Sequence, residues 1–122
     1  MDSRTSRANK AKGAGFESAI TVYLRSLGYR ASRLARRGRK DEGDVAIDIG
    51  DIHFVIEAKA TKALSLAEWI AESQVEAANY AEARGLAAER VIPVVVAKRR
   101  MKGVAQSYAL VELETLTRII SL

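Results

Sequence analysis

Apolar residues recur with two different periods along the chain, and the change of period separates helices from strands. Apolar side chains every third or fourth position predict a helix over residues 13–27. The period shortens to two over residues 44–50 and again over 52–59, which predicts two half-buried strands. Gly50-Asp51 lies between them and suits a two-residue hairpin turn, since glycine tolerates the first central position of a type II′ turn.

The remaining pattern predicts three further strands and two further helices, in the overall order α-β-β-β-α-β-β-α. Pro93 favours an edge or early position for its strand, because proline cannot donate a ladder hydrogen bond. Without a repeat or a linker, the order predicts one α/β domain over residues 13–122, preceded by a flexible basic arm at 1–12. The further strands are expected at 29–34, 91–97 and 107–111, and the further helices at 64–84 and 113–122.

The composition limits the classes of protein and of site. The chain has 122 residues, 48% of them hydrophobic, which is enough for the core of one domain. It has no cysteine, which excludes disulfides and thiolate metal sites. No apolar run approaches the roughly 20 residues that a membrane helix needs, and no apolar stretch follows the charged N-terminus. We therefore expect a soluble, cytoplasmic protein without a membrane partner.

The charges are unevenly distributed. Residues 1–40 contain eleven Lys and Arg against two acids, whereas residues 41–57 contain six acids and no Lys or Arg. A basic flank beside an acidic patch is typical of an enzyme that binds a polyanion and holds metal ions next to it. The alternative is a basic protein with ordinary charge scatter.

The predicted hairpin brings two carboxylates together. With Gly50-Asp51 as the turn, Asp44 lies opposite Glu57, with Cβ atoms roughly 4.5–5.5 Å apart on one face. Lys59 shares that face. Two opposed carboxylates repel each other unless a cation lies between them, and Mg²⁺ prefers such oxygen ligands. The alternative is a solvated strand face with a Glu–Lys neighbour pair.

Such a site suits phosphodiester hydrolysis without a covalent nucleophile. A bound divalent ion polarises a phosphoryl oxygen and lowers the pKa of a bound water. Lys59 could orient that water or stabilise the negative charge that grows in the transition state. By contrast, Asp48 and His53 form a predicted cross-strand surface pair, too far along the strand to share the ion.

The pair Gly43-Asp44 followed by Glu57-Ala58-Lys59 resembles the motif of the PD-(D/E)XK nuclease superfamily. Within it, the chain is most similar to the archaeal-type Holliday junction resolvases, whose opening helix with a glutamate resembles the segment that ends at Glu17. Gly28-Tyr29 resembles the pair that follows that helix, and the likeness covers about residues 12–100. The superfamily proline is replaced here by Gly43, a position without chemistry.

The resemblance implies a restriction-endonuclease-like fold, with a mixed central sheet flanked by helices around an α-β-β-β-α-β core. It also implies a homodimer that hydrolyses branched DNA, four-way junctions above all, with Mg²⁺ or with Mn²⁺ in its place. Glu17, Asp44 and Glu57 would then hold the metal, and Lys59 would take the part of the catalytic lysine. Two other functions stay open: a nuclease of this fold for a repair, restriction or flap substrate, and a non-catalytic DNA-binding module.

Further residues are expected to support the site. Gln74 either assists the catalytic lysine from the long helix or is a boundary residue that reaches water, and Trp69 is expected in the core. A cluster of basic side chains before Asp44 suits contacts to DNA phosphates, with a solvated loop as the alternative. This cluster comprises Arg33, Arg36, Arg37, Arg39 and Lys40.

Overall fold

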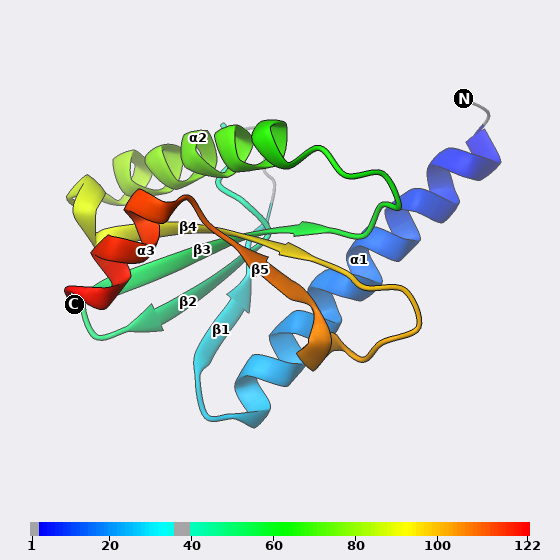
Figure 1. Ribbon diagram of the computed structural model, residues 1–122, viewed down its shortest axis with the longest axis horizontal. Coiled ribbons are helices and arrows are strands. Elements are labelled where there is room, and N and C mark those ends of the chain that lie inside the picture. Colours follow the sequence, from blue (N-terminus) through cyan, green and yellow to red (C-terminus); the bar gives the residue numbers. More distant parts are fainter. Residues whose placement is uncertain (1–2, 36–39) are drawn as a thin grey trace.

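The computed structural model describes residues 3–35 and 40–122, with side chains from residue 13 onward. Figure 1 shows one sheet with helices packed against it, in the order that the sequence predicts. The elements are α1 (Ser3–Ser26), β1 (Arg30–Arg33), β2 (Val45–Ile49), β3 (Ile52–Lys59), α2 (Leu66–Arg84), β4 (Val91–Ala97), β5 (Tyr108–Leu110) and α3 (Leu113–Ile120), with short 3-10 turns η1 (Ala88–Arg90) and η2 (Val104–Gln106).

The five strands form one mixed sheet in the order β1-β2-β3-β4-β5. All neighbours are antiparallel except β3 and β4, which run parallel because α2 carries the chain back between them. The mixed α/β fold is therefore confirmed. Pro93 is accommodated inside the sheet because it is early in β4, and β5 pairs only with the later residues Val95 to Ala97.

The hairpin has the predicted register. Ile49 pairs with Ile52, and the pairing continues to Val45 with Ile56. Gly50 has a φ of 60°, the left-handed conformation that the first turn position requires. Asp48 and His53 face each other as predicted, with 2.8 Å between Oδ1 and Nδ1.

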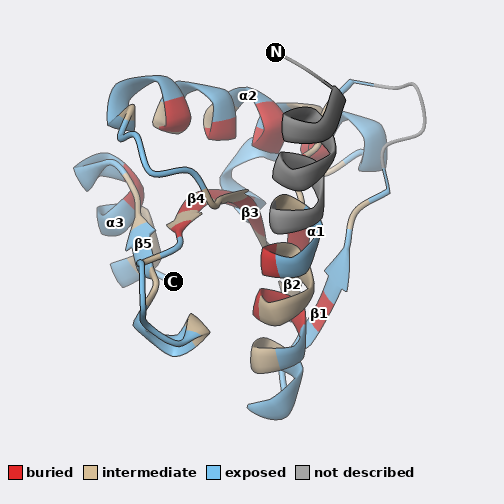
Figure 2. Cartoon of the chain, turned by 90° about the vertical axis from the view of Figure 1, so that its right-hand side faces the viewer, coloured by how far each residue is buried: buried red, intermediate tan, exposed pale blue. Residues whose placement is uncertain are grey.

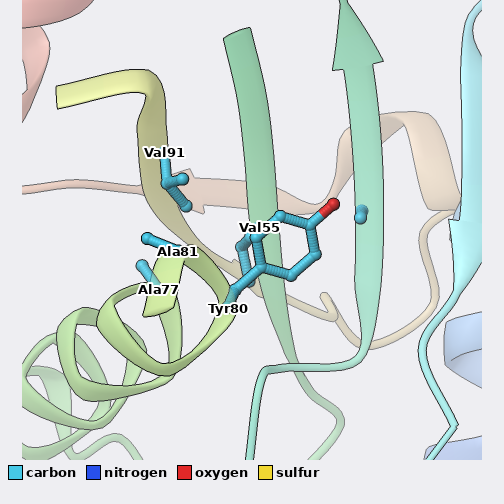
Figure 3. Close-up of a cluster of buried hydrophobic side chains, with 6 residues drawn as sticks. Val55, Ala77, Tyr80, Ala81 and Val91 are labelled. Atoms are coloured by element: carbon cyan, nitrogen blue, oxygen red, sulfur yellow. The ribbon is translucent and has the colours of Figure 1, made fainter. Parts of the chain in front are cut away.

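Helices cover both faces of the sheet, because alternate strand residues point to opposite sides. On one face, Phe16 and Ile20 of α1 pack against Val45 and Ile56. On the other face, Figure 3 shows Tyr80 of α2 lying across the strands. Figure 2 shows buried positions concentrated on the sides of α1 and α2 that meet the sheet.

The α2 face of the sheet carries a second apolar cluster. Ala77, Tyr80 and Ala81 pack there against Val55 and Val91. Full burial of a valine such as Val55 contributes about 1.5–3 kcal/mol, so this face holds α2 over β3. The prediction that Trp69 is a core residue is confirmed, since it is 7% exposed and packs on β4.

The predicted start of the first helix is wrong, whereas the flexibility of the N-terminal arm stays a prediction. Helix α1 begins at Ser3 rather than at Gly13, so most of the expected arm belongs to the first helix. A period of apolar residues predicts only part of a helix, whereas Ala, Arg and Lys favour a helix without giving such a period. Among the residues that the structure describes, no helix combines the length and apolar composition that a membrane crossing requires.

Candidate active site

Asp44 lies immediately before β2 and is fixed by the backbone of β3. Its N–H donates to the Ile56 carbonyl at 2.9 Å, and its Oδ2 accepts the Ala58 N–H at 2.8 Å. The regular ladder ends one pair earlier, at Val45 and Ile56. The Asp44 carboxylate is therefore held beside the strand residues around Glu57 by a hydrogen bond that strand alternation alone does not predict.

Gly43 provides the turn that brings Asp44 to this position. Its φ is 97°, and a Cβ there would lie 2.7 Å from Val55 Cγ1 and 3.3 Å from the Ile56 carbonyl oxygen. Proline is restricted to φ near −65°, so a proline at this position could not adopt this conformation. Although Gly43 carries no chemistry, its conformation is a structural requirement of the site.

Three acids from three elements converge on one cavity of about 490 Å³. Glu17 comes from α1, Asp44 from the start of β2 and Glu57 from β3, and all three line it. Burial, then a hydrogen bond with Asp44 and its charge, raise the pKa of Glu17 from 4.5 to about 7. The predicted grouping of these three carboxyl groups is therefore what the structure shows, whereas their part in metal binding stays a prediction.

Lys59 lies between two acids at the end of β3. Its Nζ is 3.4 Å from Glu57 Oε1 and 2.9 Å from Glu72 Oε2. Burial alone would lower its pKa, but the hydrogen bond and charge of Glu72, together with Glu57, outweigh burial and raise the pKa. Lys59 is therefore an ammonium at neutral pH, which suits the stabilisation of negative charge rather than proton abstraction.

Sequence reasoning missed two acids of α2 that complete this arrangement. Glu72 contacts Lys59, and Glu76 contacts Glu57 in the next turn. One turn further, the Tyr80 hydroxyl lies 3.4 Å from His53 Nδ1. Residues four apart share a helix face, so α2 presents these side chains in sequence along β3. The available signal was an acid in register with the buried helix stripe, since Glu76 is flanked by Ser73, Ala77 and Tyr80.

Glu57 and Glu76 form a buried pair of acids. They are 7% and 2% exposed. Glu57 Oε2 and both carboxyl oxygens of Glu76 have no hydrogen-bond partner among the described residues. Burial first, and then contact with Glu57, raise the pKa of Glu76 from 4.5 to about 11. Two carboxylates have no donor between them, so a proton or a cation must hold this pair together.

Gln74 does not join the site, and the prediction that it supports Lys59 is wrong. Its Nε2 donates to Glu112 Oε1 at 2.6 Å, on the side of α2 that meets the start of α3. Gln74 is two residues from both Glu72 and Glu76, which places it about 200° around the helix from each of them. Its position in the apolar register misled the prediction, because the acids occupy the face over β3.

Basic side chains flank the cavity. Arg33 and Lys40 line it, and Arg33 Nη2 lies 3.5 Å from Glu17 Oε2. The other predicted DNA contacts, Arg36, Arg37 and Arg39, lie outside the described residues. A second basic segment starts beside the site, because the Lys98 N–H donates to the Lys59 carbonyl at 2.8 Å.

No protein-family model and no curated protein matches the chain. Among solved structures, the chain is similar to Hjc, a Holliday junction resolvase of the archaeal hyperthermophile Archaeoglobus fulgidus. The two share 19% sequence identity with a TM-score of 0.50, and the match covers 84% of this chain and 90% of Hjc. The chain has a restriction-endonuclease-like fold. In this fold the predicted α-β-β-β-α-β core runs from α1 to β4, and β5 and α3 follow it.

Proposed function

We propose that the chain is a divalent-cation-dependent DNA endonuclease that hydrolyses phosphodiester bonds in branched DNA, with four-way junctions as its main substrate. The observation that carries the proposal is the convergence of Glu17, Asp44 and Glu57 on one cavity, with Lys59 bonded to Glu57. The fold likeness to Hjc supports a nuclease, and the basic residues at the cavity support a polyanionic substrate.

The residues present fit a divalent metal ion. They offer hard carboxylate oxygens, the ligands that Mg²⁺ and Mn²⁺ prefer. Glu57 also has a buried oxygen without a donor, which an ion would satisfy. Glu17, Asp44 and Glu57 would hold this ion. When bound, it supplies Lewis-acid polarisation of the phosphate and a bound water of lowered pKa.

The other side chains position the substrate and balance its charge. Lys59 places an ammonium beside Glu57, where it stabilises the negative charge that develops on the phosphate oxygens. The Ala58 N–H fixes the rotamer of Asp44, so this carboxylate does not reorganise during the reaction. Arg33 and Lys40 contact the flanking phosphates without reading the bases.

The likeness to Hjc supports a junction substrate, and we propose a homodimer as the assembly that acts on it. A homodimer would present two sites to the two strands cut at a junction. Light scattering should then give twice the mass of the 13.3 kDa chain. A monomer in the presence of junction DNA would contradict this part of the proposal.

The decisive experiment compares cleavage of labelled four-way, flap and linear DNA in Mg²⁺ and Mn²⁺. Asp44→Ala and Glu57→Ala should abolish cleavage while DNA binding is largely retained. Asp48→Ala is the matched control, because Asp48 is an acid of the same strand that pairs with His53 instead. Its cleavage should equal that of the wild type.

The outcomes separate the alternatives. Preferred cleavage of flap or linear DNA would assign a different substrate to the same chemistry. Salt-sensitive DNA binding without cleavage in either metal would indicate a non-catalytic binding module. Full activity of Asp44→Ala or Glu57→Ala would refute the assignment of the site.

A further inference from the structure

The buried oxygens of Glu76 are unexplained by the proposed metal set of Glu17, Asp44 and Glu57. Glu76 is 2% exposed, and neither of its carboxyl oxygens has a hydrogen-bond partner among the described residues. Buried polar groups are almost always paired, and a buried unpaired carboxylate is costly. The neighbouring Glu57 Oε2 also has no hydrogen-bond partner among the described residues, so two adjacent side chains lack partners here.

Two further acids bring oxygens to the same point. Asp41, Glu72 and Glu76 each offer a carboxylate oxygen, and these oxygens lie within 4.8 Å of one another. Ligands that surround a hard cation at 2.0–2.6 Å are at most about 4–5 Å apart. Glu72 is exposed, Asp41 is half-buried and Glu76 is buried, so an ion could reach these oxygens from solvent.

One hydrogen bond ties Asp41 to α2, and a second orients its side chain within the loop. Asn79 donates from Nδ2 to the Asp41 carbonyl at 2.8 Å, and the Gly43 N–H donates to Asp41 Oδ1 at 3.0 Å. A Cβ on Gly43 would lie 3.4 Å from Glu76 Oε2, so the glycine allows the loop to approach this acid closely. The approach of Asp41 to Glu76 is therefore built into the fold rather than left to a free loop.

We infer that Asp41, Glu72 and Glu76 form a second divalent-cation site, next to the proposed first one and selective for hard ions such as Mn²⁺ or Mg²⁺. Glu57 contacts Glu76 and feels the charge of Asp44, so it lies between the two sites. Glu72 also bonds to Lys59 at 2.9 Å. An ion at the second site shares Glu72 with Lys59 and weakens that pair, which leaves the ammonium freer to turn to a phosphate.

The test counts bound Mn²⁺ on the full chain without DNA, by calorimetry and by the electron paramagnetic resonance of free Mn²⁺. The wild type should bind two ions. Glu76→Gln and Glu72→Gln should each bind one ion, or bind one of two ions with an affinity at least tenfold lower. Asp44→Asn should still bind the ion at the second site. Glu82→Gln, an exposed acid on the same helix, is the control and should bind two.

A wild type that binds one ion overturns the inference, and so does a Glu76→Gln variant that binds two with unchanged affinity. Because Glu72 is 42% exposed at its side chain, Glu72→Gln keeps the test decisive even if a change at the buried Glu76 prevents folding. The ion count is measured without substrate. Two ions without cleavage would refute the proposed activity alone, and cleavage with one ion would refute the second site alone.

Discussion

Replacement of Glu57 by glutamine should make the metal-free protein more stable. In the wild type, Glu57 and Glu76 face each other in a buried position without a donor between them. In Glu57→Gln, the amide nitrogen can donate to Glu76 while the amide oxygen still accepts from Lys59. The variant thus satisfies groups that the wild type leaves unpaired.

The magnitude follows from two limits. A charged pair leaves a buried acceptor unsatisfied, at a cost of about 1–3 kcal/mol. If a proton holds the pair instead, keeping it at pH 7 on a group whose ordinary pKa is 4.5 costs about 3 kcal/mol. The unfolding entropy of a chain of this length is about 260 cal/mol/K, so 1 kcal/mol corresponds to about 4 °C in Tm. Glu57→Gln should therefore raise Tm by about 4–12 °C in EDTA.

Divalent ions should cancel most or all of this advantage of the variant. An ion that binds only the folded state stabilises it by about 2.7 kcal/mol at a concentration of one hundred times Kd. With Glu57 as a metal ligand, as proposed, the wild type should gain this stabilisation in Mg²⁺, whereas Glu57→Gln lacks that ligand and should gain much less. Thermal melts followed by circular dichroism, with EDTA and with Mg²⁺, measure both effects.

The control is Glu82→Gln, a surface change that should stay within about 0.5 kcal/mol of the wild type in both buffers. If Glu57→Gln melts at or below the wild type in EDTA, the two acids are not in conflict, and the reasoning about the buried pair is wrong.

Three further predictions concern the surroundings of this pair. Gly43→Ala should lower the free energy of unfolding in urea by about 2–4 kcal/mol, because Gly43 has a left-handed φ and close neighbours. The control, Gly13→Ala in α1, should raise the free energy of unfolding by up to about 1 kcal/mol. Equal effects of the two substitutions would contradict the argument about the Gly43 turn. Since the folded state raises the Glu17 pKa to about 7, it keeps a proton that the unfolded chain releases above 4.5. Metal-free stability should therefore fall between about pH 4.5 and 7, and Glu17→Gln should flatten this fall in denaturant midpoints. Lys98→Ala combined with Lys102→Ala should lower the slope of log Kd against log salt by about 2 on junction DNA, and an unchanged slope would remove this loop from the DNA interface.

The hairpin shows how much of the site the sequence could predict. A strict period of two and a two-residue turn leave one register, because a shift of one residue would expose every apolar side chain of β2. The opposition of Asp48 to His53 and the common face of Glu57 and Lys59 follow from this local rule. The order of helices and strands was predictable because it too is set by the local period of apolar residues.

The contribution of α2 could not be derived in that way. Its apolar pattern fits more than one rotation about the helix axis, and long-range packing of Tyr80 and Trp69 selects the observed rotation. That rotation turns Glu76 toward the sheet and Gln74 away from it. The start of α1 at Ser3 could not be predicted either, because no apolar period in the sequence marks it.

Charge in the cavity constrains the order in which ligands enter. Of the described residues that line it, six are acidic and two are basic. A phosphodiester brings another negative charge, and charges about 4 Å apart near a protein surface interact by about 4 kcal/mol. DNA bound by the outer basic segments would thus be repelled from Glu57 unless protons or cations first reduced the cavity's charge. In the proposed site, protons on Glu17 and on Glu76, which contacts Glu57, compete with a metal ion, so divalent ions would have to displace them before, or together with, entry of the scissile phosphate.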